Sequence, residues 1–129
     1  MTLNENNYVD KAKQVMDELF YQGRCSLTTT KIRGLLAMTA DIYNEVLPLT
    51  EDELSDEIKG KINYLKVHFL YEVGKGKTRK DQYPVKCFIE KAHIIQYIEE
   101  IQGSRENYLL FSRYMEALVA YFKFKGGRD

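Results

Sequence analysis

The chain has 129 residues, of which 44% are hydrophobic and 29% charged, and its 19 basic residues are balanced by 19 acidic ones. This composition predicts one globular domain with a buried core and excludes a disordered chain, while the apolar runs fall short of the roughly 20 residues that a membrane span needs. The N-terminal segment lacks the features of a secretory signal, and Cys25 and Cys87 fit no metal-binding pattern. We therefore expect a cytoplasmic protein with reduced cysteines.

The pattern predicts a flexible N-terminus over residues 1–7 and a first helix over about residues 8–22. Apolar residues recur there at helical spacing, and Gly23 ends the pattern. A second helix begins at the threonine run at 28–30, whose hydroxyls can cap backbone N–H groups, and Pro48 ends it.

A third helix is expected to begin with the capping box at 50–53 and to continue to about Val73. After Ile62 its apolar stripe widens, which predicts that its second half is more deeply buried. The added apolar positions are Tyr64, Val67, Leu70 and Tyr71. The glycines, charges and proline of residues 74–84 then predict a basic loop.

Pro84 suits the first turn of a fourth helix, which Gly103 ends. Ser104 caps a fifth helix over about residues 105–125, with Gly126 as its stop. This last helix carries two apolar stripes, which predict that it packs against helices on both sides. One stripe is Tyr108, Phe111, Met115, Leu118 and Phe122, and the other is Leu110, Tyr114, Ala117, Tyr121 and Phe124. We expect an all-α, single-domain bundle of about five helices spanning residues 1–129.

Motifs for catalysis or cofactor binding are weak. Residues 76–78 give the last three letters of a phosphate-binding GK[ST] loop, but Tyr71 stands where its first glycine belongs. Glu90 and His93 have the spacing of a di-iron helix, but no second pair exists, so a half-buried histidine is favoured. We expect no enzyme activity, no metal and no cofactor.

Charge is segregated along the chain. Residues 51–57 hold five acids and no base, whereas residues 59–86 hold eight bases and two acids. Because salt screens charges beyond about 8–10 Å, a partner senses each block rather than the neutral average. Lys31 and Arg33, in the first turn of the second helix beside its threonines, suit a phosphate. The charge pattern alone does not decide whether these basic residues contact a nucleic acid or form an ordinary solvated surface.

Four stretches, in order, carry a resemblance to a known family: LTTTKIRGLL (27–36), KINYLKVHFLYEVGK (61–75), VKCFIEKAHII (85–95) and YMEALVAYFKFKGGRD (114–129). Together they resemble the small subunit of the type III-A CRISPR–Cas effector, the Csm complex. The C-terminal block is the longest and most specific of them.

The resemblance implies a helical structural subunit of an antiviral RNA-guided interference complex, without catalytic activity. Such subunits stack as an inner filament and bind the guide and target RNA backbone without reading sequence. They contact the large multidomain subunit, the backbone subunits and further copies of themselves. The basic residues expected to bind RNA are Lys31, Arg33, Lys61, Lys66, Lys75 and Arg128.

The chain departs from the family pattern by inserting residues between its Gly-basic segment and VKCFIEKA. This insertion carries three of the four additional RNA-binding candidates, Lys59, Lys77, Arg79 and Lys80. An alternative hypothesis is a helical protein–protein adaptor that makes no RNA contact and uses the acidic residues 51–57 to pair with a basic neighbour.

Overall fold

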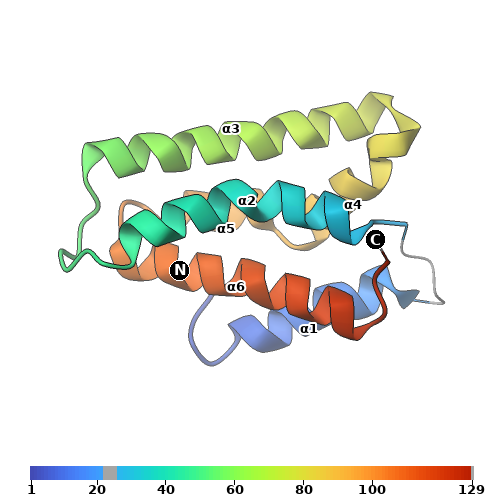
Figure 1. The fold of residues 1–129 in the computed structure, drawn as a ribbon, viewed down its shortest axis with the longest axis horizontal. Coiled ribbons are helices and arrows are strands. Elements are labelled where there is room, and N and C mark those ends of the chain that lie inside the picture. Colours follow the sequence, from blue (N-terminus) through green and yellow to red (C-terminus); the bar gives the residue numbers. More distant parts are fainter. Residues whose placement is uncertain (22–25, 129) are drawn as a thin grey trace.

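The computed structural model describes residues 1–21 and 26–128, so the predicted helix stop at Gly23 and the thiol of Cys25 lie outside the described residues. The chain folds as an all-α single domain, as predicted (Figure 1). Its elements are α1 (Tyr8–Leu19), α2 (Thr29–Val46), α3 (Asp56–Thr78), the 3-10 turn η2 (Lys80–Gln82), α4 (Tyr83–Lys91), α5 (Ile94–Glu99) and α6 (Arg105–Phe124). The described residues form no strand, and one isolated bridge joins Glu53 to Ser104.

Helix α6 is the central member of the bundle. It packs against α1 on one side and α2 on the other, while α3 contacts α2, α4 and α5 (Figure 1). The whole first stripe predicted for α6 is buried, and Tyr114 of the second stripe is buried too. Phe124, at the end of the second stripe, is 82% exposed, so the prediction of packing on both sides is confirmed for most of α6 but not for its last turn.

Two buried tyrosines of α6 bond to neighbouring helices. The Tyr108 hydroxyl donates to the Thr39 carbonyl of α2 at 2.7 Å, and the Tyr114 hydroxyl donates to the Ala92 carbonyl at the end of α4 at 2.8 Å. Each bond lets a polar phenol lie in the core without losing its hydrogen bond. The ends of α6 are as predicted, because the Ser104 hydroxyl accepts from the Asn107 N–H and Gly126 takes a left-handed φ of 94°.

The predicted capping box at 50–53 is wrong, because α3 begins only at Asp56. Ser55 is its cap, with a hydroxyl that accepts from the Ile58 N–H at 3.3 Å. The segment before it is extended and bonded to the start of α6: Leu54 N–H donates to the Gly103 carbonyl, and the Asp52 carbonyl accepts from Arg105 N–H, both at 2.8 Å. These contacts, together with burial of Leu54, hold residues 52–54 out of the helix.

The predicted loop over 74–84 is also wrong in large part, because α3 continues to Thr78 and η2 and α4 follow almost directly. Gly76 makes this tight connection sterically feasible. A Cβ at Gly76 would lie 2.3 Å from Cβ of Lys86 and 2.9 Å from the Gln82 carbonyl oxygen. Glycine therefore lets α3 and α4 approach each other closely.

The fourth predicted helix is divided into α4 and α5 by His93, which has a left-handed φ of 53°. The chain turns there and buries Ile94, Tyr97 and Ile98. Carbonyls at a helix end lack intrahelical partners, and the Tyr114 hydroxyl supplies one to the Ala92 carbonyl at this break.

The second half of α3 is not more deeply buried, contrary to the prediction. Tyr64, Val67, Leu70 and Tyr71 are 65%, 56%, 48% and 62% exposed, respectively. The buried stripe of α3 stays one face wide, through Ile62, Leu65, Phe69 and Val73.

The N-terminal residues 1–7, expected to be flexible, are anchored. Leu3 is 2% exposed, and Thr2 donates from its backbone N–H and its hydroxyl to the Glu100 carboxylate at 2.6 and 3.0 Å. No helix in the described ranges is both long and apolar enough to cross a membrane.

The observed cap of α3 predicts that Ser55→Ala lowers the free energy of unfolding by about 1 kcal/mol, since the Ile58 N–H loses its acceptor. Thr50→Ala is the matched control, because Thr50 is exposed and lies outside the helix, and it should change stability by less than about 0.5 kcal/mol. Urea unfolding of both variants checks this. If Thr50→Ala lowered the free energy of unfolding more than Ser55→Ala, Thr50 and not Ser55 would be the cap of α3.

Burial raises the pKa of the Tyr108 and Tyr114 phenols well above their usual value. In the unfolded chain both ionise near pH 10, whereas the folded chain keeps both protonated. Their contribution to stability is therefore complete below about pH 10 and is lost as pH rises above it, by about 1.4 kcal/mol per pH unit for each tyrosine. Urea unfolding between pH 9 and 11 measures this slope.

The slope should become shallower when Tyr108 and Tyr114 are replaced by Phe. Tyr64→Phe, which alters an exposed side chain, should keep the wild-type slope. A double variant that also kept it would contradict the assignment to the buried phenols.

Candidate nucleic-acid interface

The N-terminus of α2 was expected to seat a phosphate on its N–H groups, but two of these are already bonded. The Thr28 hydroxyl accepts from the Lys31 N–H at 3.2 Å. The Thr29 N–H donates to the Arg128 carbonyl at 2.6 Å, so the C-terminal tail lies across the helix start. Phosphate recognition at this end therefore depends on side chains rather than on the backbone.

Lys31 and Arg33 are both exposed but lie on different flanks of α2. The Lys31 ammonium lies 3.3 Å from the side-chain oxygen of Gln82, next to the α3–α4 turn. Arg33 instead lines a groove between α2 and α6 that Lys123 also lines. The structure thus brings Lys31 to the basic turn and separates it from Arg33.

The α3–α4 turn carries four of the predicted basic residues. Lys77 and Lys80 are exposed, and neither forms an ion pair with any described residue. Arg79 lies 3.3 Å from Asp81, and Lys75 lies 3.1 Å from Glu72 with its ammonium 5.2 Å from the Tyr71 ring centre.

Asp81 is the acid within this turn. The Gln82 amide donates to it and, with the Arg79 charge, holds the pKa of Asp81 below its usual value despite partial desolvation. The carboxylate therefore stays ionised and offsets part of the positive charge contributed by Arg79.

The first half of α3 presents its lysines to acids from other elements. Lys61 lies 2.5 Å from Glu45 of α2, Lys66 lies 3.4 Å from Glu99 of α5, and Lys59 lies 3.1 Å from Glu53. The hydrogen bond from Lys61 to Glu45 raises the pKa of Lys61, which stays protonated. Exposed ion pairs of this kind are weak, so each of these lysines has a carboxylate beside it that another anion can displace.

Arg128 is exposed, and its backbone is held by Thr29. The neighbouring Lys123 ammonium lies 3.4 Å from the Thr29 hydroxyl and 3.2 Å from the Gly127 carbonyl. The tail therefore adds positive charge to the beginning of α2, which the sequence alone placed nearly 100 residues away.

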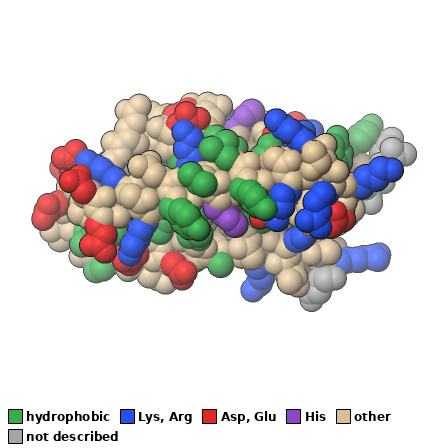
Figure 2. All heavy atoms as spheres, turned by 90° about the horizontal axis from the view of Figure 1, so that it is seen from above, with side chains coloured by type: hydrophobic (Ala, Val, Ile, Leu, Met, Phe, Trp, Pro, Cys, Tyr) green, Lys and Arg blue, Asp and Glu red, His purple; other side chains and the backbone are tan. Residues whose placement is uncertain are grey.

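The acidic block and the later part of the basic block lie at opposite ends of the bundle, whereas Lys59 and Lys61 of the basic block lie beside acids. We define the basic end by Lys31, Arg33, Lys77, Arg79, Lys80 and Arg128, and the acidic end by Glu51, Asp52, Glu53, Asp56 and Glu57. Figure 2 shows acidic side chains gathered at one end of the molecule and Lys and Arg side chains towards the other. An anionic polymer is thus attracted to one end and repelled from the other.

The geometry does not support the cofactor motifs. Residues 76–78 lie in the last turn of α3, not between a strand and a helix as a phosphate-binding loop would. His93 lies at the α4–α5 break with its ring 6.1 Å from that of Tyr97. Across residues 1–21 and 26–128, no three His, Cys, Asp or Glu side chains gather as a metal site.

Comparison with known proteins identifies the family. The model of the family described as Csm2 Type III-A matches residues 2–128. The chain belongs to the Csm2 family. The resemblance seen in the four sequence stretches is therefore confirmed, and Csm2 is the small subunit of the type III-A CRISPR–Cas Csm complex.

Relatives cover nearly the full chain. The protein named CRISPR system Cms protein Csm2 from Streptococcus thermophilus is 40% identical over 129 residues, covering 98% of both chains. The relative of the same name from Mycobacterium tuberculosis is 35% identical over 129 residues, covering 100% of this chain and 99% of its own. The one from Enterococcus italicus is 31% identical over 124 residues, covering 95% and 82%.

Proposed function

We propose that this Csm2-family chain is a non-catalytic structural subunit that binds the guide and target RNA backbone of its complex without sequence specificity. Family membership makes it a subunit of the type III-A Csm complex. The observation that carries the RNA-binding proposal is the basic end, where Lys77 and Lys80 are exposed. Among the described residues neither forms an ion pair, and the Lys31 ammonium contacts the side-chain amide of Gln82.

Side chains of this kind recognise phosphate rather than bases. Lysine is a flexible point charge on a long stem, and exposed lysines on a helix end and a turn can follow a phosphate backbone of any sequence. Binding releases condensed counterions, so the affinity should depend strongly on salt. Base pairing with the guide then supplies the sequence specificity that this surface lacks.

The opposite charges of the two ends support a second part of the proposal, that copies stack as an inner filament. The acidic end of one copy would lie towards the basic end of the next, and a head-to-tail contact repeats without closing. The basic side chains at the edge of this junction would stay open to RNA. In this arrangement Lys31 and Arg33, on the flanks of α2, would face RNA. The proposed partners are the guide RNA, the target RNA, the large multidomain subunit, the backbone subunits and further copies, assembled in the cytoplasm.

Of the predicted RNA contacts, Lys31, Arg33, Lys77, Lys80 and Arg128 carry the proposal most directly. Lys75 and Arg79 also lie at this end, each beside an acid. Lys59, Lys61 and Lys66 would bind RNA only by exchanging a carboxylate for a phosphate.

Reversal of Lys31 and Arg33 to Glu should weaken binding of a single-stranded RNA by about a hundredfold, since each of the two charge-assisted contacts contributes about 1.5 kcal/mol, or about tenfold. The slope of log affinity against log salt should become shallower by about 1.4, or about 0.7 per lost phosphate contact. Fluorescence anisotropy at several salt concentrations measures both. A variant with unchanged affinity and slope would overturn the assignment.

The matched control reverses Lys91 and Arg113, which lie outside the basic end, and changes the net charge equally. It should lower the affinity less and leave the slope close to that of the wild type. Equal effects of both double variants would mean that only net charge matters.

The adaptor alternative is supported by the carboxylates that neutralise Lys59, Lys61 and Lys66. RNA footprinting of complexes assembled with and without this subunit separates the two functions. We expect protected nucleotides that appear only when the subunit is present and that are lost in the Lys31 and Arg33 double reversal. An adaptor would leave no footprint of its own.

A further inference from the structure

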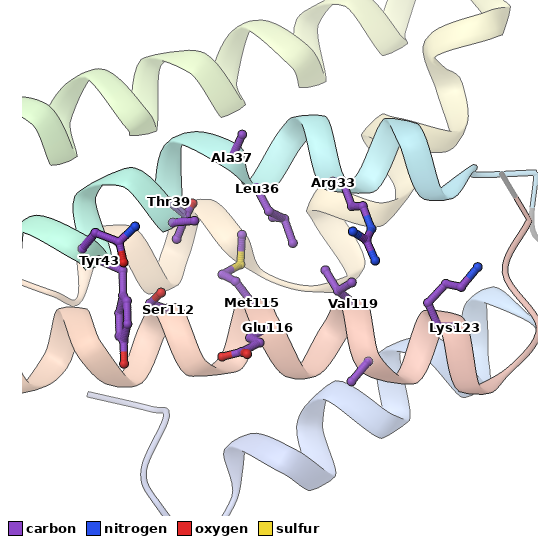
Figure 3. A pocket seen from close by; sticks show the side chains of 13 residues that line it. Arg33, Leu36, Ala37, Thr39, Tyr43, Ser112, Met115, Glu116, Val119 and Lys123 are labelled. Atoms are coloured by element: carbon purple, nitrogen blue, oxygen red, sulfur yellow. The ribbon is translucent and has the colours of Figure 1, made fainter. Parts of the chain in front are cut away.

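A groove lies between α2 and α6, which we call the α2–α6 groove (Figure 3). It has a volume of about 560 Å³ and runs from Arg33 to Asn44 along α2 and from Lys123 to Ser112 along α6. Ten residues of helix rise about 15 Å, so the groove is roughly three helical turns long.

The floor and walls of the groove are suited to an apolar partner. Leu36 and Met115 are nearly buried at its base, and Val119 lies beside them. Ala37 and Ala40, on the α2 wall, are exposed, and alanine side chains let the backbone of a docking helix come close. Third helices commonly pack into such a groove between two others.

A buried hydroxyl in this groove lacks a partner. Thr39 lines the groove and is 2% exposed, yet its side-chain oxygen bonds to no described residue. Leaving such a group unsatisfied costs free energy, so native proteins rarely keep one without a reason. A ligand in the groove that supplied one polar atom would remove this cost.

The charges around the groove indicate which ligand fits. Arg33 and Lys123 lie at one end, and Glu116 lies midway along the α6 wall (Figure 3). An RNA strand along the groove would bring phosphates past the Glu116 carboxylate, which repels them. A protein helix with one acidic residue at the Arg33 end meets no such repulsion.

We propose that the α2–α6 groove docks an amphipathic helix of a neighbouring protein subunit. The apolar face of that helix covers Leu36 and Met115, one of its polar atoms bonds to the Thr39 hydroxyl, and an acidic side chain lies against Arg33 and Lys123. This inference rests on membership of a multisubunit complex and not on RNA binding. It assigns Arg33 to a protein carboxylate in the assembled complex, so RNA contact at the start of α2 would then fall to Lys31.

The first test replaces Ala40 by Arg, which fills the groove from an exposed helix position, and measures how much subunit is retained in the purified complex. Retention should fall at least about fivefold, while RNA affinity of the isolated chain stays equal or rises because a positive charge is added. Gln14→Arg on the exposed surface of α1 adds the same charge elsewhere and should be retained like the wild type. Wild-type retention of Ala40→Arg would overturn the proposal.

Retention of Ala40→Arg and RNA binding by the Lys31 and Arg33 reversal test the groove proposal and the RNA proposal separately. If Ala40→Arg is lost from the complex while the Lys31 and Arg33 reversal leaves RNA binding unchanged, the RNA proposal fails and the groove proposal stands. If Ala40→Arg is retained like the wild type while the Lys31 and Arg33 reversal weakens RNA binding, the groove proposal fails and the RNA proposal stands.

A second test places a photo-crosslinking amino acid at position 37 in the assembled complex. The expected adduct is to a helix of another subunit that carries Asp or Glu within one or two turns of the linked residue. An adduct to RNA, an adduct to a second copy of this chain, or no adduct would each overturn the proposal.

A third test uses Thr39→Val, which keeps the shape of the side chain and removes the hydroxyl. The isolated chain should melt a few degrees higher because a buried unsatisfied group is gone, whereas retention in the complex should fall by about threefold. A variant that gained stability and assembled like the wild type would show that the hydroxyl has no partner in the complex and would contradict the proposal.

Discussion

The rest of the structure depends on the burial of α6 between α1 and α2. A helix that is apolar on two sides can be stable in water only when other helices cover both. The phenols of Tyr108 and Tyr114 then need acceptors, and carbonyls of α2 and of the α4 end supply them. These bonds fix α6 against α2 and against the end of α4, and the end of α6 lies beside the start of α2, where the basic residues gather.

Much of the fold follows from local sequence signals, such as the residues that cap helices. The threonines at the start of α2, Ser104 before α6 and the glycine after α6 act as predicted, because a cap depends on residues within one turn of itself. The errors have the opposite origin. Ser55 caps α3 because residues 52–54 are held by the distant segment 103–105. The residues next to 52–54 in the sequence do not predict that contact.

The apolar face of α3 shows a second limit. The pattern from Tyr64 to Tyr71 indicates apolar side chains but cannot say whether a helix of the same chain covers them. In the described part of the bundle these side chains are exposed. The candidate RNA site was only partly predictable for a similar reason. The clustering of Lys77 and Lys80 is visible in sequence, whereas the pairing of Lys61 and Lys66 with Glu45 and Glu99 is created by helix packing.

The bond from the Thr29 N–H to the Arg128 carbonyl joins the tail after α6 to the start of α2, and it affects which amino acids position 128 can accept. The tail holds the helix through a main-chain oxygen, which every amino acid possesses, so this fastening is indifferent to the side chain at position 128. That side chain can therefore be exchanged to suit an outside surface while the join between the helices persists. The backbone of Arg128 thus holds the fold together, while its exposed side chain is free to vary.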